Sequence, residues 1–338
     1  MLRNLSSNDK DRERDFPYTN CYKHVLGGCH RIMGGYMLNK QVMEVYDILD
    51  QKSGIVEGLT ALYADRGYGG EIETARVADK ASTVFLKFHF PGSEGKSAGG
   101  SAPTLGIVGQ LGGLQTRGKI GMVSDGDGAV AALAAALKLT DMHKQGVILP
   151  GDIIITTHIC TDAPLLPREP VPFMGLPVDM VALNQYLVDP AMDAIISLDT
   201  TKGNQILNHK GIAITSTVKK GYILKVSDGL LSILGQVTGE LPYVLPISTQ
   251  DITTYHNGLR HINRIMQPAT LTDAPVIGLA ITAQYVVPGC ATGASNAQDI
   301  EMAARFCLEA AKEFGRDPAL FYEEAEYGAL VKFYGDLT

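Results

Sequence analysis

The sequence lacks the features that mark nucleic-acid-binding, membrane-spanning and secreted proteins. Its net charge is -7 and it has no cluster of Lys and Arg beyond Lys219-Lys220, whereas a general nucleic-acid surface needs many clustered cations. Its apolar stretches are interrupted by polar, Gly or Pro residues before they reach the roughly 18 positions that a membrane helix needs. Residues 1–17 are charged and contain no apolar core of a signal peptide. We therefore expect a cytoplasmic protein that binds neither nucleic acid nor membrane.

Cysteine is scarce and widely spaced. The five cysteines include no CxxC pair, and they are Cys21, Cys29, Cys160, Cys290 and Cys307. An odd, scattered set in a large chain is typical of free thiols in a reducing compartment. The sequence therefore predicts no disulfide framework.

The sequence does contain enough apolar material for a large core, since 45% of its 338 residues are hydrophobic and 19% are charged. Residues 1–17 are expected to form a solvated arm, and residues 18–338 a single α/β domain. The Gly- and Ser-rich segment 91–103 is too long for a structural turn, so we expect a mobile loop or lid there.

The stretch 119–161 predicts one complete strand, helix, strand unit. A β-branched run at 119–123 is followed by turn residues at 124–128, an Ala- and Leu-rich helix at 129–145 and a second β-branched run at 153–157. Two strands joined through a helix are expected to run parallel, so both end at one edge of a sheet. Ligands bind at the carboxyl ends of strands in open α/β sheets, which makes this edge the candidate site.

Further strands and helices are expected on both sides of this unit. The expected strands are 83–90, 193–198, 211–218, 221–226, 243–247 and 275–282, and the expected helices are 36–51, 228–237 and 298–314. Ser295 is expected to cap the last helix. The GxxGxxG spacing within 105–113 does not lead from a strand into a helix, so no dinucleotide site is expected.

Acidic residues and histidines recur where the expected strands end. They are His89, Asp125, Asp127, His158, Asp162 and Asp199. Such side chains suit a divalent cation, with zinc first and cobalt or manganese as alternatives. The cation would lower the pKa of a bound water and polarise a carbonyl while a nearby carboxylate accepts the proton. For Asp127 the alternative is an ordinary helix cap.

Four segments in order resemble the co-catalytic zinc aminopeptidase, dipeptidase and aminoacylase superfamily. They are HFPG at 89–92, VSDGDGAVAALAAALKL at 123–139, DAIISLD at 193–199 and PVIGLAIT at 275–282. The resemblance implies a three-layer α/β sandwich, with a mixed, mostly parallel sheet and helices on both faces. It also implies that His89 is the first metal ligand, Asp125 the bridging aspartate and Asp199 a later acidic ligand.

The sequence departs from this superfamily at two places. The paired glutamates are absent after Ile155, where the segment reads THICTD and either His158 or Asp162 is available instead. The histidine of the last loop is absent from PGCATGASN at 288–296, and His256 is the nearest substitute. Either the metal set is rearranged, His256 completes it, or the scaffold is kept without metals. The small-domain insertion of the superfamily is absent or reduced.

The resulting prediction is a metal-dependent hydrolase of an amide or peptide bond in a small-molecule or short-peptide substrate. The predicted metal ligands are His89, Asp125, Asp199 and His158, and the predicted catalytic groups are Asp127, His158 and Asp162. The resemblance also implies a homo-oligomer.

Two other functions stay open at this point. Cys160 and Cys290 both follow expected strands, and two thiols facing one substrate could remove and return an α-proton, as in a cofactor-independent racemase. The missing superfamily ligands favour instead a non-catalytic small-molecule binding protein on a peptidase scaffold.

Overall fold

The structure is a computed structural model that describes residues 37–79, 81–110, 121–167, 173–202, 208–247, 264–285, 287 and 293–337. The chain divides into two compact units, 1–34 and 35–338, and the described residues all belong to the second. The predicted arm at 1–17 lies outside the described residues, as do His256 and Cys290.

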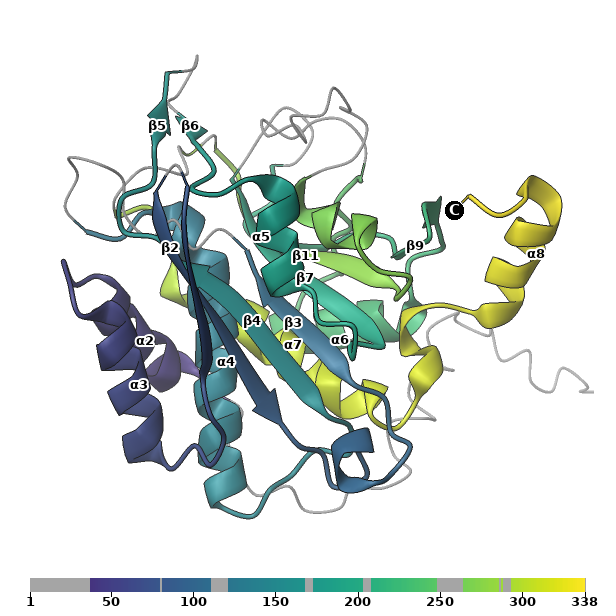
Figure 1. The fold of residues 1–338 in the computed structure, drawn as a ribbon. Helices are drawn as coiled ribbons and strands as arrows, with labels where there is room; N and C mark the ends of the chain where they lie inside the picture. The colour runs from purple at the N-terminus through teal and green to yellow at the C-terminus, as the bar shows by residue number, and fades with distance from the viewer. Residues whose placement is uncertain are drawn as a thin grey trace, which may run out of the picture. The chain divides into compact units, whose positions relative to one another are not determined.

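Within the described residues nine strands form one mixed sheet, in the order β1-β2-β4-β3-β7-β11-β9-β10, with β8 paired to β11 (Figure 1). The strands are β1 (Glu73–Ala78), β2 (Ser82–Phe90), β3 (Leu105–Gly109), β4 (Ile153–Ile159), β7 (Ala194–Lys202), β8 (Gly211–Ile214), β9 (Val218–Lys219), β10 (Tyr222–Ile223) and β11 (Val276–Ala283). A separate two-stranded ribbon joins β5 (Leu165–Leu166) and β6 (Phe173–Met174). The central strands β4, β3, β7 and β11 are parallel, and β1, β2, β8 and β9 pair antiparallel. We call the edge where the four parallel strands begin the amino edge, and the edge where they end the carboxyl edge.

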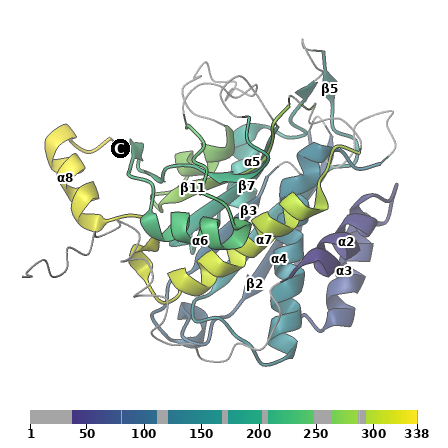
Figure 2. The same cartoon turned by 180° about the vertical axis from the view of Figure 1, so that it is seen from behind.

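Helical elements cover both faces of the sheet, which confirms the predicted α/β sandwich. The α-helices are α2 (Asn39–Leu49), α3 (Ile55–Arg66), α4 (Asp127–Lys144), α5 (Met180–Leu187), α6 (Asp228–Thr238), α7 (Ala297–Phe314) and α8 (Glu324–Tyr334). The 3-10 turns are η1 (Lys96–Ala98), η2 (Ser124–Gly126), η3 (Arg264–Thr270) and η4 (Pro318–Phe321). On one face α4 and α7 pack on the strands, flanked by α2, α3 and α6 (Figure 2), and α5 and η3 pack on the other.

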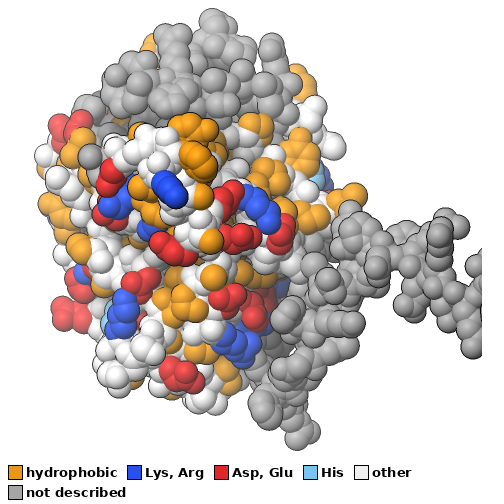
Figure 3. Space-filling model, turned by 90° about the vertical axis from the view of Figure 1, so that its right-hand side faces the viewer, with side chains coloured by type: hydrophobic (Ala, Val, Ile, Leu, Met, Phe, Trp, Pro, Cys, Tyr) orange, Lys and Arg blue, Asp and Glu red, His pale blue; other side chains and the backbone are white. Residues whose placement is uncertain are grey.

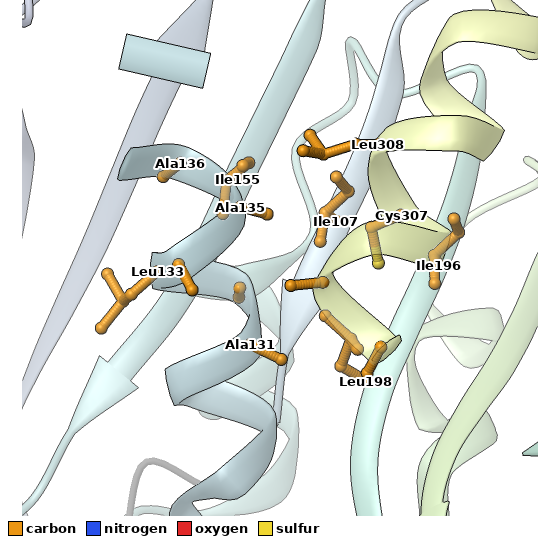
Figure 4. Packing of buried hydrophobic residues seen from close by; sticks show 14 of the residues in the cluster. Ile107, Ala131, Leu133, Ala135, Ala136, Ile155, Ile196, Leu198, Cys307 and Leu308 are labelled. Atoms are coloured by element: carbon orange, nitrogen blue, oxygen red, sulfur yellow. The ribbon is translucent and has the colours of Figure 1, made fainter. Parts of the chain in front are cut away.

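The alternation of side chains along the strands separates the two cores. Ile107 and Ile196 belong to the core under α4 and α7, whereas Val108 and Ile195 belong to the core under α5 and η3. Helix α4 is buried on nearly every side, and its alanines let it approach α7 and the sheet closely (Figure 4). Among the described residues, every helix is too short or too polar to span a lipid bilayer.

The strand that precedes α4 in the strand, helix, strand unit is β3, and not the strand predicted at 119–123. Strand β3 is buried at all five positions and lies between β4 and β7. Of the predicted strand at 119–123 only 121–123 are described, and these form no strand. A central parallel strand is covered on both faces, so its sequence does not alternate, and LGIVG with its two glycines was not among the expected strands.

The predicted lid at 91–103 lies at the wrong edge to cover the candidate site. Strand β2 runs antiparallel to β4 and pairs His89 with Ile154, so the chain leaves β2 at the amino edge. There the buried Asp152 carboxylate accepts hydrogen bonds from the Gly92 N–H (2.8 Å), the Ser97 N–H (2.9 Å) and the Ser97 hydroxyl (2.6 Å). These bonds fasten the segment to the start of β4.

On the face seen in Figure 3, acidic and basic side chains lie beside one another. Two ion pairs of this kind in the C-terminal half are Lys220–Asp273 at 3.1 Å and Lys225–Asp228 at 2.7 Å. Neighbouring charges of opposite sign largely cancel, and exposed pairs of this type contribute at most about 1 kcal/mol each.

Candidate functional site

Three polar residues lie in one row across the carboxyl edge. The ladders of β3 with β4 and with β7 align Gly109 with Thr157 and with Leu198. The next residue along each strand is Gln110, His158 and Asp199, respectively. Because neighbouring strands are about 4.8 Å apart, Gln110 lies next to both His158 and Asp199, which are two strand spacings from each other. We call Gln110, His158 and Asp199 the polar row.

The polar row is buried on the face of the sheet that α5 covers. Its side chains are only 1%, 0% and 2% exposed, in that order. The Gln110 side-chain amide donates a hydrogen bond to the Ser197 hydroxyl at 2.8 Å, and the Gln110 N–H continues the ladder by donating to Leu198 O at 2.8 Å. Asp199 lies two residues after Ser197 and therefore on the same side of β7. The ring of His158 lies 5.8 Å from that of Phe85.

A second carboxylate, that of Asp127, lies over the other face at the start of α4. Asp127 is fully buried and accepts a hydrogen bond from the Ser295 hydroxyl at 2.5 Å, just before α7. Burial raises the pKa of the nearby Tyr46 phenol, a hydrogen bond with Ser295 lowers it, and the charges of Asp50 and Asp127 raise it. Asp127 thus joins the beginnings of α4 and α7. The cap of α7 is Asn296, so the prediction of Ser295 as the cap is wrong.

Two glycines bring the start of α4 against the strand ends. A Cβ atom at Gly128 would lie 2.8 Å from Gln110 O and 3.0 Å from Leu198 O. A Cβ atom at Gly109 would lie 2.6 Å from the Cβ of Ala132. Only glycine permits this approach, and it fixes the backbone of the polar row.

The other two acidic candidates are less buried than Asp127 and Asp199. Asp125 is half-buried in η2, and Asp162 is exposed beyond the end of β4. The η2 turn is tied to β7 because the Thr200 hydroxyl donates to Ser124 O at 3.0 Å. Asp199 and His158 lie inside their strands rather than after them as the sequence predicts.

His89 does not join the other predicted ligands. Its partner in the ladder is Ile154 at the start of β4, whereas His158 lies near the end of the same strand. The placement of His89 at the carboxyl edge was wrong because β2 runs antiparallel, which a single strand does not reveal.

The described residues do not fit the predicted metal site. No group of three or more His, Cys, Asp or Glu is placed to hold a metal ion in the described ranges. The proposed set of His89, Asp125, Asp199 and His158 is therefore not assembled there. The central position of the row is occupied by the amide of Gln110, which binds zinc less readily than imidazole, thiolate or carboxylate.

The structure also bears on the thiol alternative. Cys160 is buried, and burial raises the pKa of its thiol. A nucleophilic thiolate needs a lowered pKa, so this shift disfavours Cys160 as the reacting group of a racemase. Cys290, the second thiol of that hypothesis, lies outside the described residues.

Sequence reasoning missed Gln110 and the role of Ser295. Gln110 follows an apolar run, LGIVG, and a polar residue directly after such a run is the available signal. No local signal pairs Ser295 with Asp127, because these residues are distant in sequence and meet only through the packing of α4 and α7.

Three solved structures are similar to this chain at low sequence identity. The bottromycin maturation enzyme BotP gives a TM-score of 0.48 and 14% identity, covering 82% of this chain and 70% of that one. A cytosol aminopeptidase from Coxiella burnetii gives 0.45 and 12%, covering 81% and 68%. An Acidobacteriales bacterium glutaminyl cyclase gives 0.46 and 12%, covering 86% and 97%. No functional conclusion follows from likeness at this level.

No curated protein matches the sequence. A protein family described as "Protein of unknown function (DUF1177)" matches residues 74–338, which is more than half of the chain. The chain therefore belongs to the DUF1177 family.

Proposed function

We propose that this protein hydrolyses an amide or peptide bond of a small substrate at the carboxyl edge, with the polar row supplying the reacting groups. The observation that carries the proposal is the row itself, an imidazole, an amide and a carboxylate buried side by side on three parallel strands. Burying such groups costs free energy that apolar residues would not cost. The carboxyl ends of parallel strands are also where α/β proteins bind ligands.

The row contains the two kinds of group that amide hydrolysis needs. Asp199 is the proposed proton acceptor: the oxygen of a water molecule bonds to the carbonyl carbon while its proton passes to the carboxylate. His158 is the proposed proton donor: its imidazolium protonates the leaving nitrogen as the C–N bond breaks. After the products leave, Asp199 releases its proton to water and His158 takes up a proton from water, which restores both groups. Gln110 lies between them and orients the substrate amide.

Asp127 has a positioning role in this proposal. Its hydrogen bond from Ser295 holds the beginnings of α4 and α7 together, and α4 in turn packs against Gln110 through Gly128. Loss of Asp127 would therefore disturb the row through the helix rather than remove a reacting group.

A metal ion enters no step of this mechanism, and its presence is tested separately. Elemental analysis of protein purified without chelator gives the metal content per chain. About one or two zinc, cobalt or manganese ions per chain, lost in Asp125→Asn, would replace the mechanism with a metal-activated water.

The direct test is a screen of dipeptides, acylated amino acids and cyclic amides for release of free amine. Asp199→Asn and His158→Gln are each expected to lower kcat by about 100-fold or more, because general acid–base groups contribute roughly that much. Asp47→Asn, an exposed change on α2, is the matched control and should leave kcat unchanged. Melting temperatures show whether each variant is folded. Hydrolysis that survives both row variants unchanged would refute the proposal.

A non-catalytic binding function is the second candidate, and the uncharged amide at the centre of the row favours it. In that case, compounds from the same screen bind without being cleaved. Gln110→Ala would then weaken binding, and Asp199→Asn would alter affinity alone.

A further inference from the structure

A cavity of about 560 Å³ lies at the amino edge beside the end of β2. Its walls come from the turn between α3 and β1, the end of β2 and the last turns of α4. The lining residues include Tyr68, Glu71, Glu73, His89, Phe90 and His143. The volume falls within the roughly 300 to 1,000 Å³ of small-molecule sites. The cavity is separate from the polar row, because His89 lies near the start of β4 and His158 near its end.

Among the described lining residues the charged side chains are all acidic. Glu71 is exposed at the rim, and Glu73 retains a side chain that is 61% exposed although it pairs with Lys87 at 2.8 Å. Burial lowers the pKa of His143, so its ring is neutral near pH 7 and adds no positive charge. The charges at this cavity therefore favour a cationic ligand.

The other walls are aromatic and held in place. The Tyr68 hydroxyl accepts a hydrogen bond from the His89 N–H at 3.0 Å and lies 3.1 Å from His89 O, to which it donates. The ring of Phe90 lies 5.2 Å from that of Tyr68 and 5.6 Å, edge-on, from that of His143. Fixed aromatic rings attract cations through their faces and also pack against apolar groups.

We propose that this cavity binds an organic ammonium ion that carries an aromatic or apolar group. The ammonium lies at the side of Glu71 and Glu73, and the apolar group packs against Tyr68, Phe90 and His143. This site is independent of the proposed hydrolase activity, since it shares no residue with the polar row.

The test uses three probes of similar size and different charge: 2-phenylethylammonium, 3-phenylpropan-1-ol and 3-phenylpropionate. Titration calorimetry on the full chain is expected to show saturable binding of the ammonium, weaker binding of the alcohol and none of the carboxylate. The affinity for the ammonium should fall as salt is raised, because the attracting carboxylates are exposed. The NMR signals of the histidine ring protons show where the ammonium binds, and those of His89 and His143 should shift.

A matched pair of double variants tests the acidic side of the cavity. Glu71→Gln/Glu73→Gln is expected to weaken binding of the ammonium about fivefold and to leave the alcohol unchanged. Glu240→Gln/Glu323→Gln removes two exposed carboxylates elsewhere and should change neither. Equal binding of the carboxylate probe, no saturable binding of the ammonium, or equal effects of the two double variants would overturn the proposal.

Discussion

Both edges of the sheet carry carboxylates, but these carboxylates do different things. At the amino edge, Asp152 and Asp193 accept hydrogen bonds from the backbone and side chains of the segment that joins β2 to β3. At the carboxyl edge, Asp199 belongs to a row of polar side chains contributed by neighbouring strands. The amino-edge acids hold a loop in place, whereas the carboxyl-edge acid is grouped with an imidazole and an amide.

The difference shows that residue type and position at a strand end do not by themselves identify a functional group. His89 and His158 both lie near an end of a strand, yet the direction of β2 places them at opposite edges. If the two edges differ in this way, substitutions at the amino edge should lower the stability without affecting hydrolysis. Substitutions at the carboxyl edge should affect hydrolysis more than stability.

The largest effect on stability is expected from Asp152→Ala. The change removes an acceptor of three hydrogen bonds and leaves the Gly92 and Ser97 N–H groups without it, at a cost of about 3 kcal/mol in the free energy of unfolding. Urea unfolding measures this cost, and Asp65→Ala, an exposed change on α3, is the control with an expected effect within about 0.5 kcal/mol. A loss below about 1 kcal/mol for Asp152→Ala would show that the loop is not held by this carboxylate.

The next largest effect tests the carboxyl edge through Gly128→Ala. The new Cβ would meet Gln110 O and Leu198 O, so we expect a loss of about 2 kcal/mol and a displaced polar row that hydrolyses more slowly. The matched change Gly328→Ala, in α8 with nothing within 4 Å, should instead stabilise by up to about 1 kcal/mol through helix propensity. The same sign for both variants in thermal unfolding would contradict the close approach of α4.

The elements that the sequence predicts well are those specified locally. The segments 36–51, 228–237 and 298–314 were expected to be helices and are α2, α6 and α7 within a few residues, because one apolar face recurs along each. The strands β4 and β11 were likewise expected from β-branched runs. Such patterns depend on neighbours in sequence and do not need the fold.

The candidate site was harder to predict because it depends on partners that are distant in sequence. The direction of β2 is set by its antiparallel pairing with β4. This pairing places His89 and the segment 91–103 at the amino edge and not at the carboxyl edge. Strand β3 is too buried and too rich in glycine to alternate, so Gln110 was not expected at a strand end. His158 and Asp199 were identified as candidates from the sequence. That they lie on either side of Gln110 follows only from the order of the strands in the sheet, which the sequence does not reveal.

A smaller effect is expected from the dependence of stability on pH. Burial raises the pKa of the Asp152 carboxyl, but hydrogen bonds from Gly92 and Ser97 outweigh burial and hold the pKa below its ordinary value of 3.8. The unfolded chain therefore binds this proton more tightly, so the stabilisation is full above the unfolded-state pKa and is lost as pH falls through the lower folded-state value. In urea unfolding, the advantage of wild type over Asp152→Asn should shrink below about pH 4. An advantage that stays constant to lower pH would contradict this assignment.

The smallest effect is expected from Lys96→Ala, which removes an exposed ion pair from the same amino edge. The Lys96 ammonium lies 2.6 and 2.7 Å from the two Asp193 oxygens, but its side chain is 53% exposed, so water and salt screen the pair. Asp193 keeps its hydrogen bond from the Thr104 N–H at 2.7 Å, and no buried group is left unsatisfied. We expect a loss of about 0.5 kcal/mol at low salt that declines in high salt, measured by urea unfolding at two ionic strengths. A loss as large as that of Asp152→Ala would mean that the ion pair, rather than the buried carboxylate, holds the loop at this edge.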